Sequence, residues 1–203
     1  MVSDAGSGLS QQIKALSASD QSTRESAAAQ IFAQGRELAR PAIARWLADE
    51  QLAPCFVLDA SRAPHQTVGI AVHPHNFESI RAACGSPPLA EVPPDQDALE
   101  FELEFPGALH LDILTSRHPA GDGAIARFLQ KFGEGVQQVE LQVSSVDAAT
   151  QLLRDRFQIT PVFPATRPGA NNTRINFFLV PLSTGAKVLI ELVEAPTAPH
   201  SLC

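Results

Sequence analysis

The sequence predicts an α+β protein in which paired βαβββ modules form a curved open sheet, or cup, after an N-terminal all-α helical appendage. Three observations predict this fold class. Residues 8–50 carry a helical pattern without any strand signal, many short segments after residue 60 alternate apolar and polar residues, and one helix plus several strands recurs in the same order. The chain of 203 residues, 44% of them hydrophobic, can bury a sizeable core.

Residues 1–60 are predicted to be the helical region. Ser19 and Asp20 precede a run rich in alanine and glutamine, where they supply a start signal for a helix. Gly35 is expected to end that helix, and Pro41 is expected in the first turn of the next one. The resulting hairpin resembles one HEAT-type repeat, and the alternative is a helical cap on the following domain.

Residues 61–197 are predicted to form the second domain, with one module at 65–116 and the other at 134–195. The first module reads TVGIAV, a helix through NFESIRAAC, then DALEFELEF and ALHLDILT. The second reads GVQQVELQV, a helix through SVDAATQLLRDRF, then TRINFFLV and AKVLIELV. A short additional strand is expected at PLAEV in the first module and at ITPVF in the second. The segment GAIARFLQKFG predicts an amphipathic helix that links the two modules.

The predicted strands have one apolar side and one mixed side, because side chains along a strand alternate between faces. If the two modules curl together, the mixed side lines a cup, and this side carries the predicted ligand-binding residues. These are Thr67, His110, Asp112, Gln138, Glu140, Arg174, Asn176 and Lys187, and Glu191 shares their side. Leu114, Phe178 and Leu189 fall on the same side, which gives the mixed lining of a ligand cleft. The alternative is a face that is merely solvated.

Composition excludes several classes of partner. The net charge is −7, from 22 acidic and 15 basic residues, and no cluster of Lys and Arg offers a nucleic-acid footprint. No run of about 18 apolar residues predicts a membrane span, and the first residues lack the pattern of a secretion signal. The three cysteines show no C-x-x-C spacing, which argues against disulfides and structural zinc. We therefore expect a cytoplasmic protein without nucleic-acid or membrane partners.

Three longer segments carry a family resemblance that spans roughly residues 65–195. VGIAV, GAIARFLQKFGEGVQQVEL and TRINFFLVPLSTGAKVLIELVE resemble the vicinal oxygen chelate superfamily, and within it the methylmalonyl-CoA epimerase branch. The resemblance implies one metal ion in the cup, held by the first and last strand of each module. The corresponding positions are Thr67, Asp112, Gln138 and Glu191. Both positions where the family most often has histidine, Thr67 and Gln138, have lost it.

This loss changes the chemistry that the resemblance implies. Imidazole is a good ligand for zinc, cobalt and nickel, whereas hydroxyl and amide oxygens are poor ones. Asp112, Gln138 and Glu191 remain as candidate metal ligands, so we expect no cofactor, with magnesium, manganese or calcium as the alternative. His65 and His110 are displaced from the family positions by two residues, or about 6.6 Å of strand. The resemblance also implies Glu191 as the candidate catalytic base.

The predicted function is the binding of a small organic ligand in a cup whose usual divalent metal site is degraded. One alternative is a divergent metal-dependent epimerase or glyoxalase-type isomerase or lyase. Another is an interaction protein that uses its helical region. A homodimer is expected from the family resemblance alone.

Overall fold

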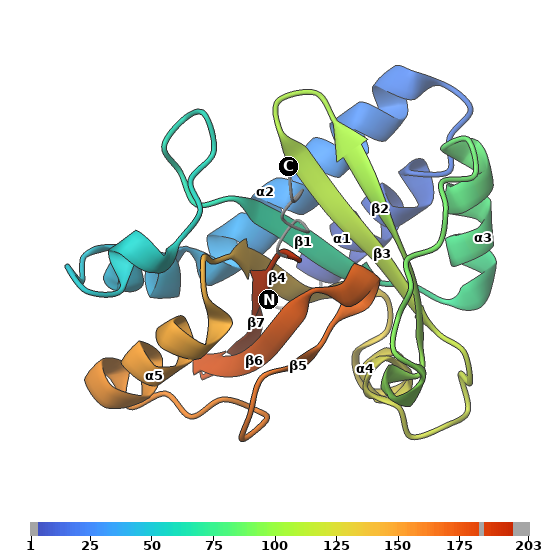
Figure 1. The fold of residues 1–203 in the computed structure, drawn as a ribbon. Helices are drawn as coiled ribbons and strands as arrows, with labels where there is room; N and C mark the ends of the chain where they lie inside the picture. Colours follow the sequence, from blue (N-terminus) through green and yellow to red (C-terminus); the bar gives the residue numbers. More distant parts are fainter. Residues whose placement is uncertain (1–3, 183–184, 197–203) are drawn as a thin grey trace, which may run out of the picture.

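A single mixed sheet of seven strands forms the centre of the computed structural model, which describes residues 4–182 and 185–196 (Figure 1). The order of the strands is β2-β3-β1-β4-β7-β6-β5. Their bounds are β1 Gln66–Ala71, β2 Ala98–Phe105, β3 Leu109–Ser116, β4 Gly135–Gln142, β5 Arg167–Pro168, β6 Arg174–Pro181 and β7 Lys187–Glu194. The sheet curls into a half-barrel, which confirms the predicted α+β fold class.

The sheet is built from two modules that repeat the same pairing. The first strand of each module pairs in parallel with the last, β1 with β3 and β4 with β7. The two first strands pair antiparallel at the centre of the sheet. A helix follows each first strand, α3 (Pro74–Ala83) and α5 (Val146–Phe157), and α4 (Ala124–Phe132) links the modules. The expected duplication therefore defines the architecture.

The short strands expected at PLAEV and ITPVF are wrong. The first segment is irregular: the Ala90 amide donates to the Glu100 carbonyl, no ladder continues from this bond, and prolines flank the segment on both sides. The second makes only an isolated bridge between Pro161 and Phe178, and the short strand of that module lies further on, at β5. Proline donates no backbone hydrogen bond, so these segments cannot continue a ladder.

Two helices make up the N-terminal region, α1 (Asp4–Ala15) and α2 (Gln21–Leu47). Asp20 begins α2 as expected, because its carboxylate accepts a hydrogen bond from the Thr23 amide at 2.8 Å. The expected stop at Gly35 is wrong, and Pro41 also lies inside α2 rather than in a first turn. A β-carbon on Gly35 would lie 2.5 Å from Val68 Cγ1. The glycine therefore permits close packing of α2 on β1.

Helix α2 lies across both modules on the apolar face of the sheet (Figure 1). Ile31 is buried in a cluster with Val68 of β1, whereas Trp46 is buried in a second cluster with Val139 of β4. Helices α1, α3 and α5 contribute to the same two clusters, which leaves the opposite face of the sheet for the cup. The domain boundary at residue 60 and the HEAT-like interpretation stay predictions. Within the described ranges, no helix has the length and apolar character needed to cross a membrane.

Candidate functional site

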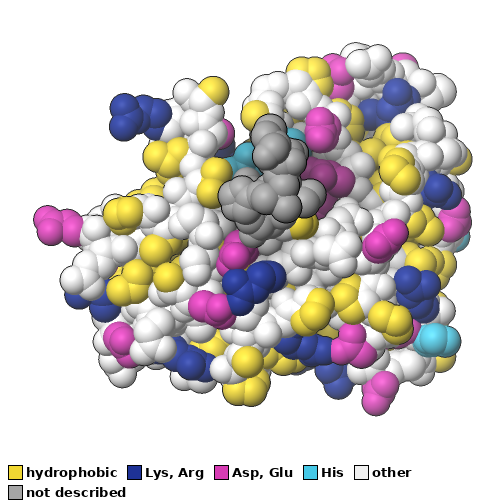
Figure 2. All heavy atoms as spheres, in the orientation of Figure 1, with side chains coloured by type: hydrophobic (Ala, Val, Ile, Leu, Met, Phe, Trp, Pro, Cys, Tyr) yellow, Lys and Arg dark blue, Asp and Glu magenta, His cyan; other side chains and the backbone are white. Residues whose placement is uncertain are grey.

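The face of the sheet that these helices leave open is hollowed into a cavity of about 840 Å³. Acidic side chains and a histidine gather near the middle of the face seen in Figure 2. Five carboxyl groups on neighbouring strands line the cavity: Glu100, Glu102, Asp112, Glu140 and Glu191. Apolar side chains line another part of it: Leu114, Phe163, Ile175, Phe177, Leu189 and Val193. The cup is therefore amphipathic.

Sheet register brings the polar side chains together. Glu102 pairs with Asp112, and Glu140 pairs with both Thr67 and Glu191 across neighbouring strands. Gly69 pairs with Asp112 on one side and with Gln138 on the other. A β-carbon on Gly69 would lie 2.7 Å from Gln138 Cγ and 3.0 Å from Leu114 Cδ1. The missing side chain at the centre of the sheet gives Gln138 and Leu114 their space.

Hydrogen bonds connect the buried polar groups in two pairs. The side-chain amide of Gln138 donates to the carboxylate of Glu191. The carboxyl groups of Asp112 and Glu140 form the second hydrogen-bonded pair. The structure thus brings four of the predicted residues, together with Thr67, into one cavity.

Four of the cavity acids have raised pKa values. Burial raises the pKa of Glu100 to about 7, and the neighbouring charge of Glu102 adds to the effect. Burial, followed by repulsion from nearby acids, raises the pKa values of Asp112, Glu140 and Glu191 well above their ordinary range. Each ionised group therefore costs free energy until a proton or another cation compensates it.

Basic side chains reach the cavity only from its periphery. Arg127 is exposed on α4, and Arg167 of β5 forms an ion pair with Asp95. Arg167 also lies over the ring of Phe163, with its guanidinium carbon 4.4 Å from the ring centroid. Neither β1, β2, β3, β4 nor β7 contributes a lysine or arginine to the lining. Glu102 faces His110 of β3, and within the described residues the other four carboxyl groups have no basic partner from their own strands.

The face predicted for β6 is wrong. Ile175 and Phe177 line the cavity, whereas Phe178 is fully buried in the core on the other side of the sheet. Arg174 forms ion pairs with Asp147 and Glu194 outside the cavity. Phe177 and Phe178 are adjacent in this strand, so one of them must face the core and the other the cavity. Phe178 is the one that packs in the core cluster.

Two further predicted residues do not line the cavity. Asn176 is buried, and its side-chain amide donates to the carbonyl of Phe163 at 3.3 Å. Because this hydrogen bond satisfies the amide, the polar side chain of Asn176 can lie on the covered face of the sheet. Lys187 is exposed at the start of β7. Ligand contacts of Arg174, Asn176 and Lys187 have no geometric support.

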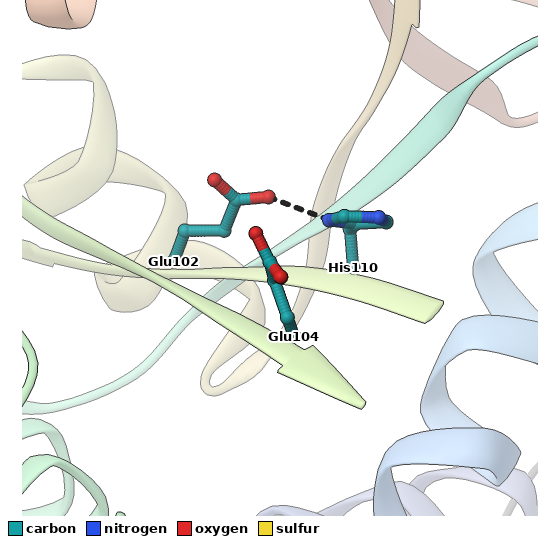
Figure 3. A group of neighbouring side chains, drawn as sticks. All are labelled: Glu102, Glu104 and His110. Atoms are coloured by element: carbon teal, nitrogen blue, oxygen red, sulfur yellow. Dashed lines mark hydrogen bonds and ion pairs between the residues drawn. The ribbon is translucent and has the colours of Figure 1, made fainter. Parts of the chain in front are cut away.

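His110 lies beside the cavity rather than in its lining, on the same face of β3 as Asp112. Its Nδ1 lies 2.8 Å from a carboxylate oxygen of Glu102, and Glu104 also points toward it (Figure 3). The ligand atoms of these three residues all lie within 4.8 Å of one another, and the ring centroid of His65 is 4.9 Å from that of His110. The spacing would fit a metal ion, but both glutamates are exposed, and exposed acidic groups of this kind are common without one.

The four positions at which the family resemblance implies a metal ion do not form an imidazole-containing site. Thr67 and Gln138 provide no imidazole, and the amide hydrogens of Gln138 are directed at Glu191. Asp112 is engaged with Glu140. The remaining donors are all oxygens, which zinc, cobalt and nickel bind less readily than nitrogen.

Sequence reasoning missed several polar residues of the cavity, among them Glu100, Glu102 and Gln137. Glu100 and Glu102 were detectable, because ALEFELEF alternates and places its glutamates on one face of β2. Gln137 lines the cavity beside Gln138 because the register between β1 and β4 shifts by one residue at this point. Such a bulge places adjacent residues in unusual directions, and no sequence signal reveals it.

Comparison with known proteins identifies structural relatives. No family model matches the sequence, and no curated protein matches it. Methylmalonyl-CoA epimerase from Mycobacterium tuberculosis is 36% identical, with a TM-score of 0.52; the match covers 64% of this chain and 87% of that one. A Streptomyces coelicolor methylmalonyl-CoA epimerase variant in complex with 2-nitronate-propionyl-CoA is 26% identical, with coverage of 66% and 99% and a TM-score of 0.53.

A methylmalonyl-CoA epimerase in complex with methylmalonyl-CoA and an ammonium ion is 27% identical, with coverage of 66% and 95% and a TM-score of 0.53. These matches agree with the paired modules, the central pairing of β1 with β4 and the cup on one face of the sheet. On this combination of fold and sequence identity, the chain belongs to the vicinal oxygen chelate superfamily.

Proposed function

We propose that the chain binds a small organic molecule in its cup and does so without the imidazole-held metal of its family. The cavity carries this proposal, because its volume of about 840 Å³ lies within the roughly 300–1,000 Å³ typical of small-molecule sites. The apolar lining supplies area for an organic body, and the carboxyl groups supply polar contacts that fix its orientation.

A second candidate function is that of a divergent epimerase or glyoxalase-type isomerase or lyase. Two observations favour it: the similarity to methylmalonyl-CoA epimerases and the raised pKa of Glu191, because a carboxylate with a raised pKa is a stronger base. Glu191 would be the base, and Asp112, Gln138 and Glu191 could hold magnesium, manganese or calcium through oxygen atoms. A bound cation of this kind would supply the electrostatic stabilisation of an enolate.

Binding and exchange measurements separate these two functions. We expect metal analysis of the purified chain and calorimetric titration with magnesium, manganese, calcium, nickel and zinc to detect no stoichiometric tight binding. We also expect no solvent deuterium to enter methylmalonyl-CoA in the presence of the chain. Metal binding or deuterium incorporation that disappears in Glu191→Gln, and persists in Glu104→Gln, would establish the enzyme instead.

The location of the protein, its oligomeric state and a role for its helical region also belong to this proposal. We propose a cytoplasmic homodimer, for which sedimentation analysis gives the mass in solution. The alternative role, an interaction through α1 and α2, predicts that substitutions at exposed positions of α2 abolish binding of a protein partner. The same substitutions should leave the cup unchanged.

A further inference from the structure

The polar part of the cup that the central strands supply is dominated by carboxyl groups, which attract positive charge. From these groups we infer that the ligand is an organic ammonium ion, an amine with an apolar body. The inference rests on the proposed function and specifies the class of ligand. The five carboxyl groups are Glu100, Glu102, Asp112, Glu140 and Glu191, and they come from four strands that add no basic side chain to the lining.

Electrostatic repulsion among these carboxyl groups determines which sign of charge the ligand should carry. Asp112 is 5% exposed and Glu191 is 6% exposed, so water screens neither carboxyl group well. An anionic ligand would make ionisation of these carboxyl groups still more costly, whereas a cation would stabilise their ionised forms and relieve the repulsion. Hence the floor of the cup favours a positively charged group over a neutral or negative one.

Two further polar groups in the lining point to a hydrogen-bond donor. Thr67 is 4% exposed, and its hydroxyl makes no hydrogen bond among the described residues. The side-chain oxygen of Gln137 is buried and is likewise without a partner there. A buried acceptor without a partner costs free energy. An ammonium group, which donates three hydrogen bonds and accepts none, complements both this oxygen and the carboxylates.

The apolar lining decides between an organic cation and a bare ion. Ile175, Phe177 and Leu189 face the same cavity as the carboxyl groups, and the cavity has room for more than a metal ion with its ligands. An ion alone would leave this apolar surface in contact with water. An amine that carries an aromatic or aliphatic body would bury it, which is favourable by about 25 cal/mol per Å² of apolar surface.

Three probes of similar shape and different charge test the inference by calorimetry on the full chain: 2-phenylethylamine, 2-phenylethanol and 3-phenylpropionate. We expect the amine to bind at least tenfold more tightly than the alcohol, and the carboxylate not to bind. We expect Glu100→Gln and Asp112→Asn to weaken binding of the amine at least tenfold. Glu104→Gln, on the same face of β2 but outside the cavity, should bind the amine as the wild type does.

Each contrary outcome has a distinct meaning. If the alcohol binds as tightly as the amine, or the carboxylate binds best, the inference is overturned while the proposed function stands. If none of the three probes binds at millimolar concentration, the inference and the proposed function both fall. If manganese or calcium binds tightly and excludes the amine, the cation is a metal and the inference is overturned. The wild-type comparison is decisive even where a variant does not fold.

Discussion

Replacing Glu100 by glutamine should make the stability of the chain less dependent on pH. Burial and the charge of Glu102 raise the pKa of Glu100 from its ordinary 4.5 to about 7. An acid whose pKa is raised by folding contributes stability that is complete below about pH 4.5 and is lost as the pH rises through about 7. Each pKa unit corresponds to about 1.4 kcal/mol, so the full effect is about 3 kcal/mol.

Between pH 5 and pH 8 the wild type should lose about 2.5 kcal/mol of this contribution, which for a chain of this size corresponds to roughly 5–10 °C in melting temperature. Glutamine has nearly the same shape and does not ionise, so Glu100→Gln should lose that much less over the same range. Thermal denaturation followed by circular dichroism, at constant ionic strength, measures both proteins. Glu104→Gln serves as the matched control and should follow the wild type. Equal pH dependence in Glu100→Gln and the wild type would refute the reasoning.

Three other substitutions test particular contacts. Phe178→Ala should lower the free energy of unfolding, measured by urea denaturation, by about 3–5 kcal/mol because Phe178 is fully buried. Phe177 lines the cavity, so Phe177→Ala should chiefly weaken ligand binding. The reverse pattern would contradict the assigned faces of β6. Gly69→Ala should destabilise by about 1–3 kcal/mol because the added carbon meets Gln138 and Leu114, and unchanged stability would contradict the crowding. Gly35→Ala should also destabilise, although alanine favours helix by about 1 kcal/mol, and a stabilised protein would disprove the close approach of α2 to Val68.

Strand alternation was sufficient to predict most of the fold and of the cup. It gave correct faces for β1, β3, β4 and β7, because the residues of these strands that were assigned to the core recur at every second position. The same reasoning failed for β6, where Phe177 and Phe178 are adjacent and polarity alone suggested that Asn176 faces the cup. Asn176 instead satisfies its amide with the Phe163 carbonyl, a contact from a distant loop that local sequence does not encode.

Long-range contacts explain the other differences as well. Gly35 has the local signature of a helix end, but the approach of Val68 determines its role, and this contact depends on the packing of α2 across the whole sheet. Glu100 and Glu102 could have been included from the alternation of β2. The pairing of the Asp112 and Glu140 carboxyl groups could not have been predicted, because it depends on the register among β3, β1 and β4.

A crystal structure of the wild-type chain with 2-phenylethylamine tests the central claim most directly. The account predicts the ammonium nitrogen within hydrogen-bonding distance of at least two of Asp112, Glu140 and Glu191, with the phenyl ring against Ile175 and Phe177. A metal ion on those carboxylates, or an amine bound only outside the cup, would contradict it.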